Sequence, residues 1–232
     1  YPLIPVVLMT GQGSEEIAVK ALQRGAASYV SKRKLALDLV DTVQLVLSAA
    51  DDTRSYSKLM NRMVSSECRF VLENNLSLIA AAVQYLQETA SNLRICNDAD
   101  RLRVGVALEE ALLNAYYHGN LQISSELREQ DHRAYYDLAR ERTRQLPFSE
   151  RRIYINATFT PEEAVYVIRD EGNGFDASTI PDPTDPANLE RACGRGRLLM
   201  QTFMDEVRYN DAGNEVTCIK RRSPADDEDD AE

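Results

Sequence analysis

Long hydrophobic runs are absent from this sequence. Its 232 residues contain no stretch of eighteen or more apolar residues, so we predict no membrane-spanning helix and no membrane partner. The first residues do not have the pattern of a signal peptide. The opening YPLIPVVLMT also has no initiator Met and reads as the middle of a strand, and we therefore expect a piece of a longer cytoplasmic protein.

Cysteine and histidine are also scarce, and the 27 Lys and Arg residues are outnumbered by 37 Asp and Glu residues. The four cysteines lie far apart, without a CxxC pair or a Cys/His cluster, and we expect reduced thiols and no zinc site. The net charge of −10 argues against nucleic-acid binding. Much of the imbalance comes from residues 223–232, SPADDEDDAE, which we expect to form a disordered, solubilising tail.

The first fifty residues alternate between strand and helix patterns. PVVLMT is a continuous apolar run, typical of a strand buried on both faces. The next segment predicts a helix with Ser14 as its N-cap and Gly25 as its stop. SYV predicts a second strand and residues 35–49 a second helix, so parallel pairing is expected. Two strands cannot bury a core by themselves.

Residues 51–66 are polar and mixed and are interpreted as a linker, for which a helical conformation stays open, whereas residues 67–222 predict an α+β layer. Strands are expected at 67–72, 152–159, 164–170, 206–210 and 215–221, and helices at 77–90, 98–119 and 196–204. Polar residues 121–150 are interpreted as an insertion with one short helix in HRAYYDLARERTRQ. The pattern favours an antiparallel-rich sheet with helices on one face.

The segment ALEEALLNAYYHGN, residues 107–120, combines two faces of one predicted helix. Core-facing spacing is shared by Leu108, Ala111, Leu112 and Ala115. Glu110, Asn114 and His118 are four residues apart and share the neighbouring face. Since buried polar groups are costly without partners, either protein groups or a ligand must satisfy these three side chains.

Two further segments have a composition suited to a nucleotide. RDEGNGFD follows a strand: Asp170 can accept from an exocyclic amine such as that of adenine, and its glycines allow close approach of backbone to a ligand. CGRGRLLM precedes a helix and would expose N–H groups to phosphates, with Arg195 or Arg197 adding charge. Asn114 offers an oxygen to phosphate-bound Mg²⁺, and Glu110 can take a proton from a hydroxyl or a water. Taken alone, each glycine motif fits an ordinary loop or turn, and Glu110 and Asn114 fit a buried pair that satisfies itself. Taken together, the three segments favour ATP with Mg²⁺ as the ligand.

These motifs resemble the N, G1 and G2 boxes of the GHKL ATPase superfamily, whose fold is the Bergerat α/β sandwich. Three segments, NAYYHGN, IRDEGNGFD and FMDEVRYNDAGNEVTCIKR, are similar in sequence to the serine/threonine kinases that act as anti-sigma factors in bacterial partner switching. The resemblance covers 67–222 and departs from the family at Arg197 and in the longer 121–150 insertion. It implies Glu110 as general base, Asn114 as Mg²⁺ ligand and Asp170 as adenine reader. It also implies four nucleotide-loop glycines, Gly172, Gly174, Gly194 and Gly196, beside which Arg195 is counted with the cofactor-binding residues for the charge that it adds.

The first fifty residues resemble the C-terminal part of a response-regulator receiver domain, which has a flavodoxin-like fold. Thr10, Tyr29 and Lys32 match its switch hydroxyl, switch aromatic and phosphoryl-contacting lysine. Arg33 and Gly11 depart from the usual proline and alanine, and a solvated surface role for Lys32 stays open. The phosphoacceptor aspartate would precede Tyr1.

Two functions follow from the resemblance. The first is a protein kinase that phosphorylates a STAS-type anti-anti-sigma protein, regulated through a receiver by an upstream phosphodonor kinase. The alternative is a non-catalytic ATP/ADP-binding module that holds a sigma factor or another partner. The presence of Glu110 favours the kinase, because nucleotide binding alone does not need a general base. Histidine-kinase output is disfavoured, since neither His118 nor His132 lies on a long helix upstream of the site. Homodimerisation stays open.

Overall fold

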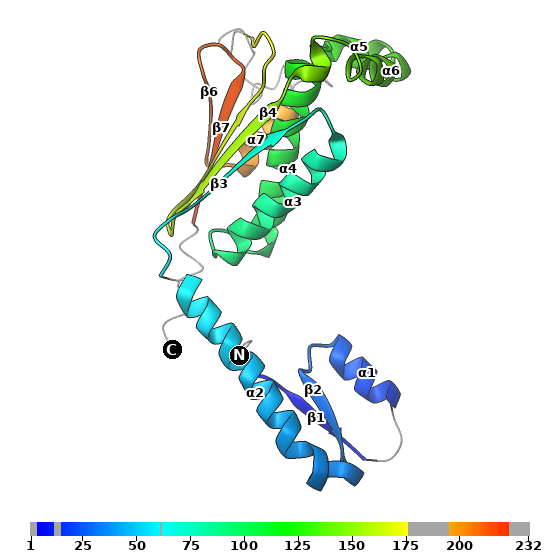
Figure 1. Ribbon diagram of the computed structural model, residues 1–232, viewed down its shortest axis with the longest axis vertical. Coiled ribbons are helices and arrows are strands. Elements are labelled where there is room, and N and C mark those ends of the chain that lie inside the picture. The colour runs from blue at the N-terminus through cyan, green and yellow to red at the C-terminus, as the bar shows by residue number, and fades with distance from the viewer. Residues whose placement is uncertain (1–3, 12–14, 61, 176–194, 223–232) are drawn as a thin grey trace. The chain divides into compact units, whose positions relative to one another are not determined.

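The computed structural model describes residues 4–11, 15–60, 62–175 and 195–222, which belong to two compact units that divide after Arg62 (Figure 1). Ser14, Cys193 and the acidic tail lie outside the described residues. Within the described part of the chain, none of the helices combines the length and apolar character needed to span a bilayer.

The first unit is a parallel two-stranded sheet with helices. Its elements are β1 (Val7–Thr10), α1 (Glu15–Gln23), β2 (Ser28–Ser31), a 3₁₀ turn (Lys32–Lys34) and α2 (Leu35–Met60). Gly25 follows α1 with a φ of +95°, a conformation that suits glycine after a helix end.

Helix α2 continues to Met60, so most of the 51–66 segment, interpreted as a linker for which a helix stayed open, is helical. One expectation for this unit needs correction. Strand β1 is not buried on both faces, because Met9 is 51% exposed. Few described side chains of this unit are buried, namely Ala18, Val30 and Val46, which agrees with the small core expected of two strands.

The second unit is built on an antiparallel sheet with the strand order β3-β4-β5-β7-β6. The strands are β3 (Ser66–Leu72), β4 (Ile153–Phe159), β5 (Glu163–Arg169), β6 (Glu206–Tyr209) and β7 (Glu215–Arg221). Along β4 and β5 every second side chain is buried, as the alternating pattern predicts for a sheet covered on one face.

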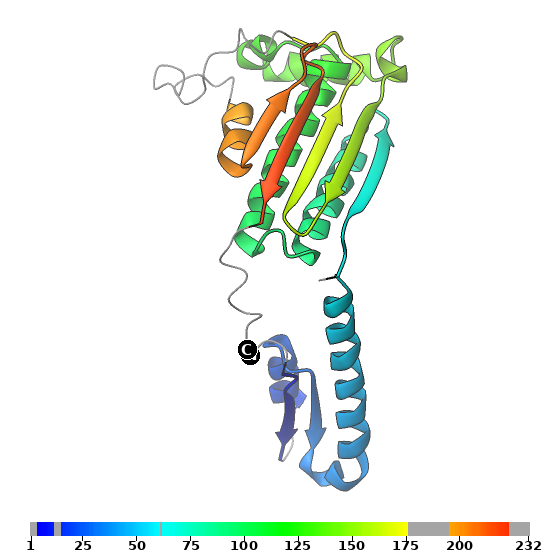
Figure 2. The same ribbon diagram turned by 90° about the vertical axis from the view of Figure 1, so that its left-hand side faces the viewer.

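Helices cover that face. They are α3 (Leu76–Asn92), α4 (Asp98–Asn114) and α7 (Arg195–Phe203), with α3 and α7 packed on either side of α4 (Figure 2). Asn75 and Asn97 cap α3 and α4 by accepting from the backbone N–H groups of Ser77 and Asp100. The result is a two-layer α/β sandwich, and the predicted fold class of this unit is confirmed.

Helix α4 does not end as a regular helix. The turn that continues it, Ala115–Asn120, is π-helical, and the N–H of Leu121 donates to the carbonyl of Tyr116 at 3.0 Å. Such widened turns are frequent at functional sites. The insertion that follows contains two helices rather than the single one expected: α5 (Ser125–Gln130) and α6 (His132–Arg142).

Candidate functional site

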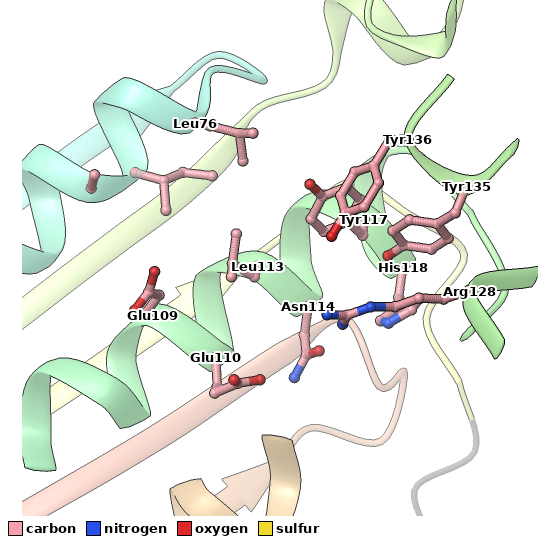
Figure 3. A pocket seen from close by; sticks show the side chains of 12 residues that line it. Leu76, Glu109, Glu110, Leu113, Asn114, Tyr117, His118, Arg128, Tyr135 and Tyr136 are labelled. Atoms are coloured by element: carbon pink, nitrogen blue, oxygen red, sulfur yellow. The ribbon is translucent and has the colours of Figure 1, made fainter. Parts of the chain in front are cut away.

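The polar face of α4 lines one pocket. Its cavity of about 280 Å³ is lined by residues from α3, α4, the π-helical turn, α5 and α6 (Figure 3). Glu110, Asn114 and His118 all border it, as their spacing predicts, while Leu108 and Leu112 on the neighbouring face are fully buried. Polar side chains therefore follow the edge of the core because one helix presents both faces.

Glu110 is half-buried, and burial raises the pKa of its carboxyl group. The guanidinium of Arg128 opposes that rise and the carboxylate of Glu109 adds to it. The first turn of α7 lies against Glu110, because a Cβ at Gly196 would clash with the Glu110 carboxyl oxygen Oε2. A partly desolvated carboxyl group beside a helix N-terminus is suited to accept a proton.

Asn114 lies one turn further along α4. A Cβ at Gly196 would be 3.8 Å from its amide nitrogen, so Asn114 also lies beside α7. Among the described residues no cluster of three or more His, Cys, Asp or Glu side chains could hold a metal ion. The donor set at Asn114 nevertheless fits Mg²⁺ in a nucleotide complex, because such an ion needs only one or two protein oxygens in addition to phosphates and water.

His118 has a structural partner. Its Nδ1 lies 2.6 Å from the carbonyl oxygen of Ile123, the segment that follows the π-helical turn. One of the three polar side chains on this face is thus satisfied within the protein, which leaves Glu110 and Asn114 facing the pocket.

Asp170 follows β5 and is only 8% exposed. Burial raises the pKa of its carboxyl group to about 6, although the N–H of Gly172 donates to it at 2.8 Å and the charges of Arg151 and Arg169 act in the opposite direction. The π-helical turn lies against this carboxyl group, because a Cβ at Gly119 would clash with it. A Cβ at Gly172 would in turn clash with the carbonyl of Gly119.

The rest of the glycine-rich loop packs on the β6–β7 hairpin turn. Gly174 has a φ of +69°, and a Cβ there would clash with the carbonyl of Ala212. The ring of Phe175 meets that of Tyr209 edge to face, with centroids 5.3 Å apart. These contacts hold the loop that follows Asp170 against the hairpin, as far as Phe175, where the described part of the loop ends.

The third predicted segment is only partly described. Gly194 and the side chain of Arg195 lie outside the described residues, whereas Arg195 starts helix α7 and Gly196 faces Glu110. Arg197, one of the two departures from the resemblance noted in the sequence, lies over the Tyr209 ring with its guanidinium carbon 5.8 Å from the ring centroid. Two of its guanidinium nitrogens are buried without a hydrogen-bond partner among the described residues.

Sequence reasoning missed two residues that join the motifs. Asn120 is fully buried: its amide donates to Asn74 and accepts from the N–H of Glu171, both at 2.9 Å. It thereby links α4 to the loop that carries Asp170. Arg128 reaches the pocket from the insertion. A polar residue at the end of the HGN triplet was a signal for Asn120, but a single sequence held none for Arg128.

The predicted receiver residues lie near one edge of the first unit. Thr10 ends β1 in register with Ser31, the last residue of β2, and Lys32 follows directly. Tyr29 is 44% exposed and Lys32 is exposed. No finding tests their switch roles, which stay a prediction.

A family model described as "Histidine kinase-like ATPase domain" matches residues 72–220. The match spans more than half of the 232 residues, so this chain belongs to that family. The matched region contains Glu110, Asn114 and Asp170 as well as the insertion. No curated protein matches the sequence.

Proposed function

We propose that this chain is an ATP-dependent serine/threonine protein kinase of the anti-sigma-factor type, which phosphorylates a STAS-type anti-anti-sigma protein. The observation that carries the proposal is the position of Glu110 beside Asn114 and the first turn of α7 in one pocket. Membership of an ATPase family supports ATP as the phosphoryl donor. A module that only held nucleotide would not need a carboxyl group at this position.

The residues take the following roles in the proposed reaction. Asp170 accepts from the adenine amine, and the N–H groups at the start of α7 face the phosphates. Asn114 would hold Mg²⁺, which neutralises charge on the phosphate oxygens when bound. The substrate hydroxyl oxygen bonds to the γ-phosphorus, the bond to the bridging β,γ-oxygen breaks, ADP leaves with that electron pair, and Glu110 takes the hydroxyl proton.

The test is phosphoryl transfer from γ-labelled ATP to a purified STAS-type protein from the same organism, with the labelled residue identified by mass spectrometry. We expect phosphoserine or phosphothreonine with the wild-type chain and at least about a hundredfold slower transfer with Glu110→Gln. ATP binding without transfer would favour the sequestering module, and capture of a sigma factor that depends on nucleotide would then establish that alternative.

We also propose that the first unit belongs to a receiver domain that regulates this kinase. The support is the placement of Thr10 at the end of β1 and of Lys32 directly after β2, two strands that pair in parallel. The full-length protein, with and without phosphorylation of its receiver, should differ in kinase output. Equal output in the two states would contradict this proposal.

A further inference from the structure

The 121–150 insertion is fixed to the end of α4. Within the insertion, the guanidinium of Arg142 donates to the carbonyls of Leu121 and Gln122 at 2.6 and 2.7 Å, which ties α6 to the residues directly after the π-helical turn. The contact with the π-helical turn itself is made by Tyr135, which is 1% exposed and whose ring packs on that of Tyr117 with centroids 5.0 Å apart. The insertion is therefore held in place rather than tethered by its ends alone.

Its two helices are also fixed internally. Ser124 caps α5 by accepting from the N–H of Glu126, and Asp131 caps α6 by accepting from the N–H of Ala134. Arg128 lies on α5, and its guanidinium carbon is 6.0 Å from the centroid of the buried Tyr135 ring. The capped helix α5 and the buried Tyr135 ring therefore restrict the positions that the Arg128 guanidinium can take.

Arg128 reaches the pocket shared by Glu110 and Asn114. Figure 3 shows its guanidinium extending toward Asn114, and its charge lowers the pKa of Glu110 against the effect of burial. Other arginines of the insertion have protein partners: Arg133 and Arg140 both pair with Asp137, at 3.7 and 3.5 Å. Among the described residues no carboxylate lies within ion-pair distance of Arg128, and no acceptor receives a hydrogen bond from it.

We propose that Arg128 binds the terminal phosphate of ATP, so that the insertion completes the phosphoryl-transfer site. This inference rests on the nucleotide binding in the proposed function, although it does not depend on which protein is phosphorylated. The terminal phosphate must lie within reach of both Glu110, which takes the hydroxyl proton, and the Mg²⁺ at Asn114. A guanidinium that extends toward Asn114 in the same pocket meets that requirement, and its planar donor fork matches phosphate oxygens.

Calorimetry on the full chain, with Mg·ATP and Mg·ADP as separate ligands, tests this assignment. Arg128→Ala should weaken Mg·ATP binding by about tenfold and leave Mg·ADP binding within about twofold, because only ATP carries the γ-phosphate. Arg128→Lys should recover part of the loss. Arg133→Ala removes an exposed arginine of the same insertion and should leave both affinities unchanged.

Equal ATP affinities for the wild-type chain and Arg128→Ala would overturn the proposal. Equal losses for ATP and ADP would do the same, since they would indicate a structural effect, and thermal unfolding of each variant shows whether the fold is intact. If the wild-type chain binds both nucleotides but transfers no phosphate to protein, the kinase proposal fails while the assignment of Arg128 stands. If the wild-type chain binds neither nucleotide, both proposals fail.

Discussion

Gly119, in the π-helical turn after α4, lies directly against the carboxyl group of Asp170 after β5. A Cβ at position 119 would lie 2.5 Å from both carboxyl oxygens of Asp170. The motif on the helix and the motif on the strand therefore meet through a position that excludes any side chain. This contact places the proposed adenine-reading carboxylate next to the helix that carries Glu110 and Asn114.

Gly119→Ala should lower both stability and ATP affinity. In an ordinary helix, Gly to Ala stabilises by about 1 kcal/mol. Here we expect a loss of about 2 kcal/mol in the free energy of unfolding, because the methyl group must displace a buried carboxyl group. Gly105→Ala in α4 is the matched control, since its Cβ would meet only the end of the flexible Gln87 side chain. Urea unfolding measures both, and a stabilised Gly119→Ala variant would contradict the proposed packing.

Asp170→Asn should stabilise the protein near neutral pH while abolishing ATP binding. Because burial raises the pKa of this carboxyl group from 3.8 to about 6, its contribution to the free energy of unfolding is fully present below pH 3.8 and is lost as pH rises through 6. At pH 7.5 the charged form is the unfavourable one. The amide, which is neutral and can still accept from Gly172, should therefore raise the free energy of unfolding by about 1–3 kcal/mol.

The same group gives a pH dependence of binding. The carboxylate form accepts from an adenine amine, so ATP affinity of the wild-type chain should fall as pH drops from 7 to 5, by about tenfold per unit below pH 6. Calorimetry at several pH values with ATP measures this. A wild-type ATP affinity that does not change between pH 7 and pH 5 would contradict this role of the Asp170 carboxylate. For the stability prediction, the stabilising effect of Asp170→Asn should be larger at pH 7.5 than at pH 5, and the opposite order would refute the role given to burial.

Asn120→Ala should destabilise the second unit by about 2–3 kcal/mol, because it removes the acceptor of the Glu171 N–H and the donor to the Asn74 side-chain oxygen. ATP affinity should fall as well, since Asn120 ties the Asp170 loop to α4. Asn156→Ala is the matched control: the Asn156 Oδ1 is buried but accepts no hydrogen bond among the described residues. Chemical denaturation distinguishes the two, and equal losses would argue against a special role for Asn120.

Much of the second unit could be predicted from the sequence because its periodicities are local. Alternation in β4 and β5 and the four-residue spacing of Glu110, Asn114 and His118 are properties of single segments. The antiparallel sheet and the pocket-facing side chains followed from these patterns together with the family resemblance.

Other features depended on contacts between distant segments. No local pattern shows that Gly119 meets Asp170, or that Arg128 reaches across to Asn114, since these contacts form only when the insertion and the loop after β5 pack on α4. The helical state of residues 51–60 stayed open at the level of sequence, because a polar, charged segment fits an exposed helix as well as a linker.

The most direct measurement of the central claim is calorimetric titration of the full chain with ATP in the presence and absence of Mg²⁺, comparing the wild type with Asn114→Ala and Glu110→Gln. We expect Mg²⁺-dependent binding to the wild type, loss of the Mg²⁺-dependent part in Asn114→Ala, and retained binding in Glu110→Gln. Failure of the wild type to bind ATP, or an Asn114→Ala variant that keeps its full Mg²⁺-dependent affinity, would contradict it.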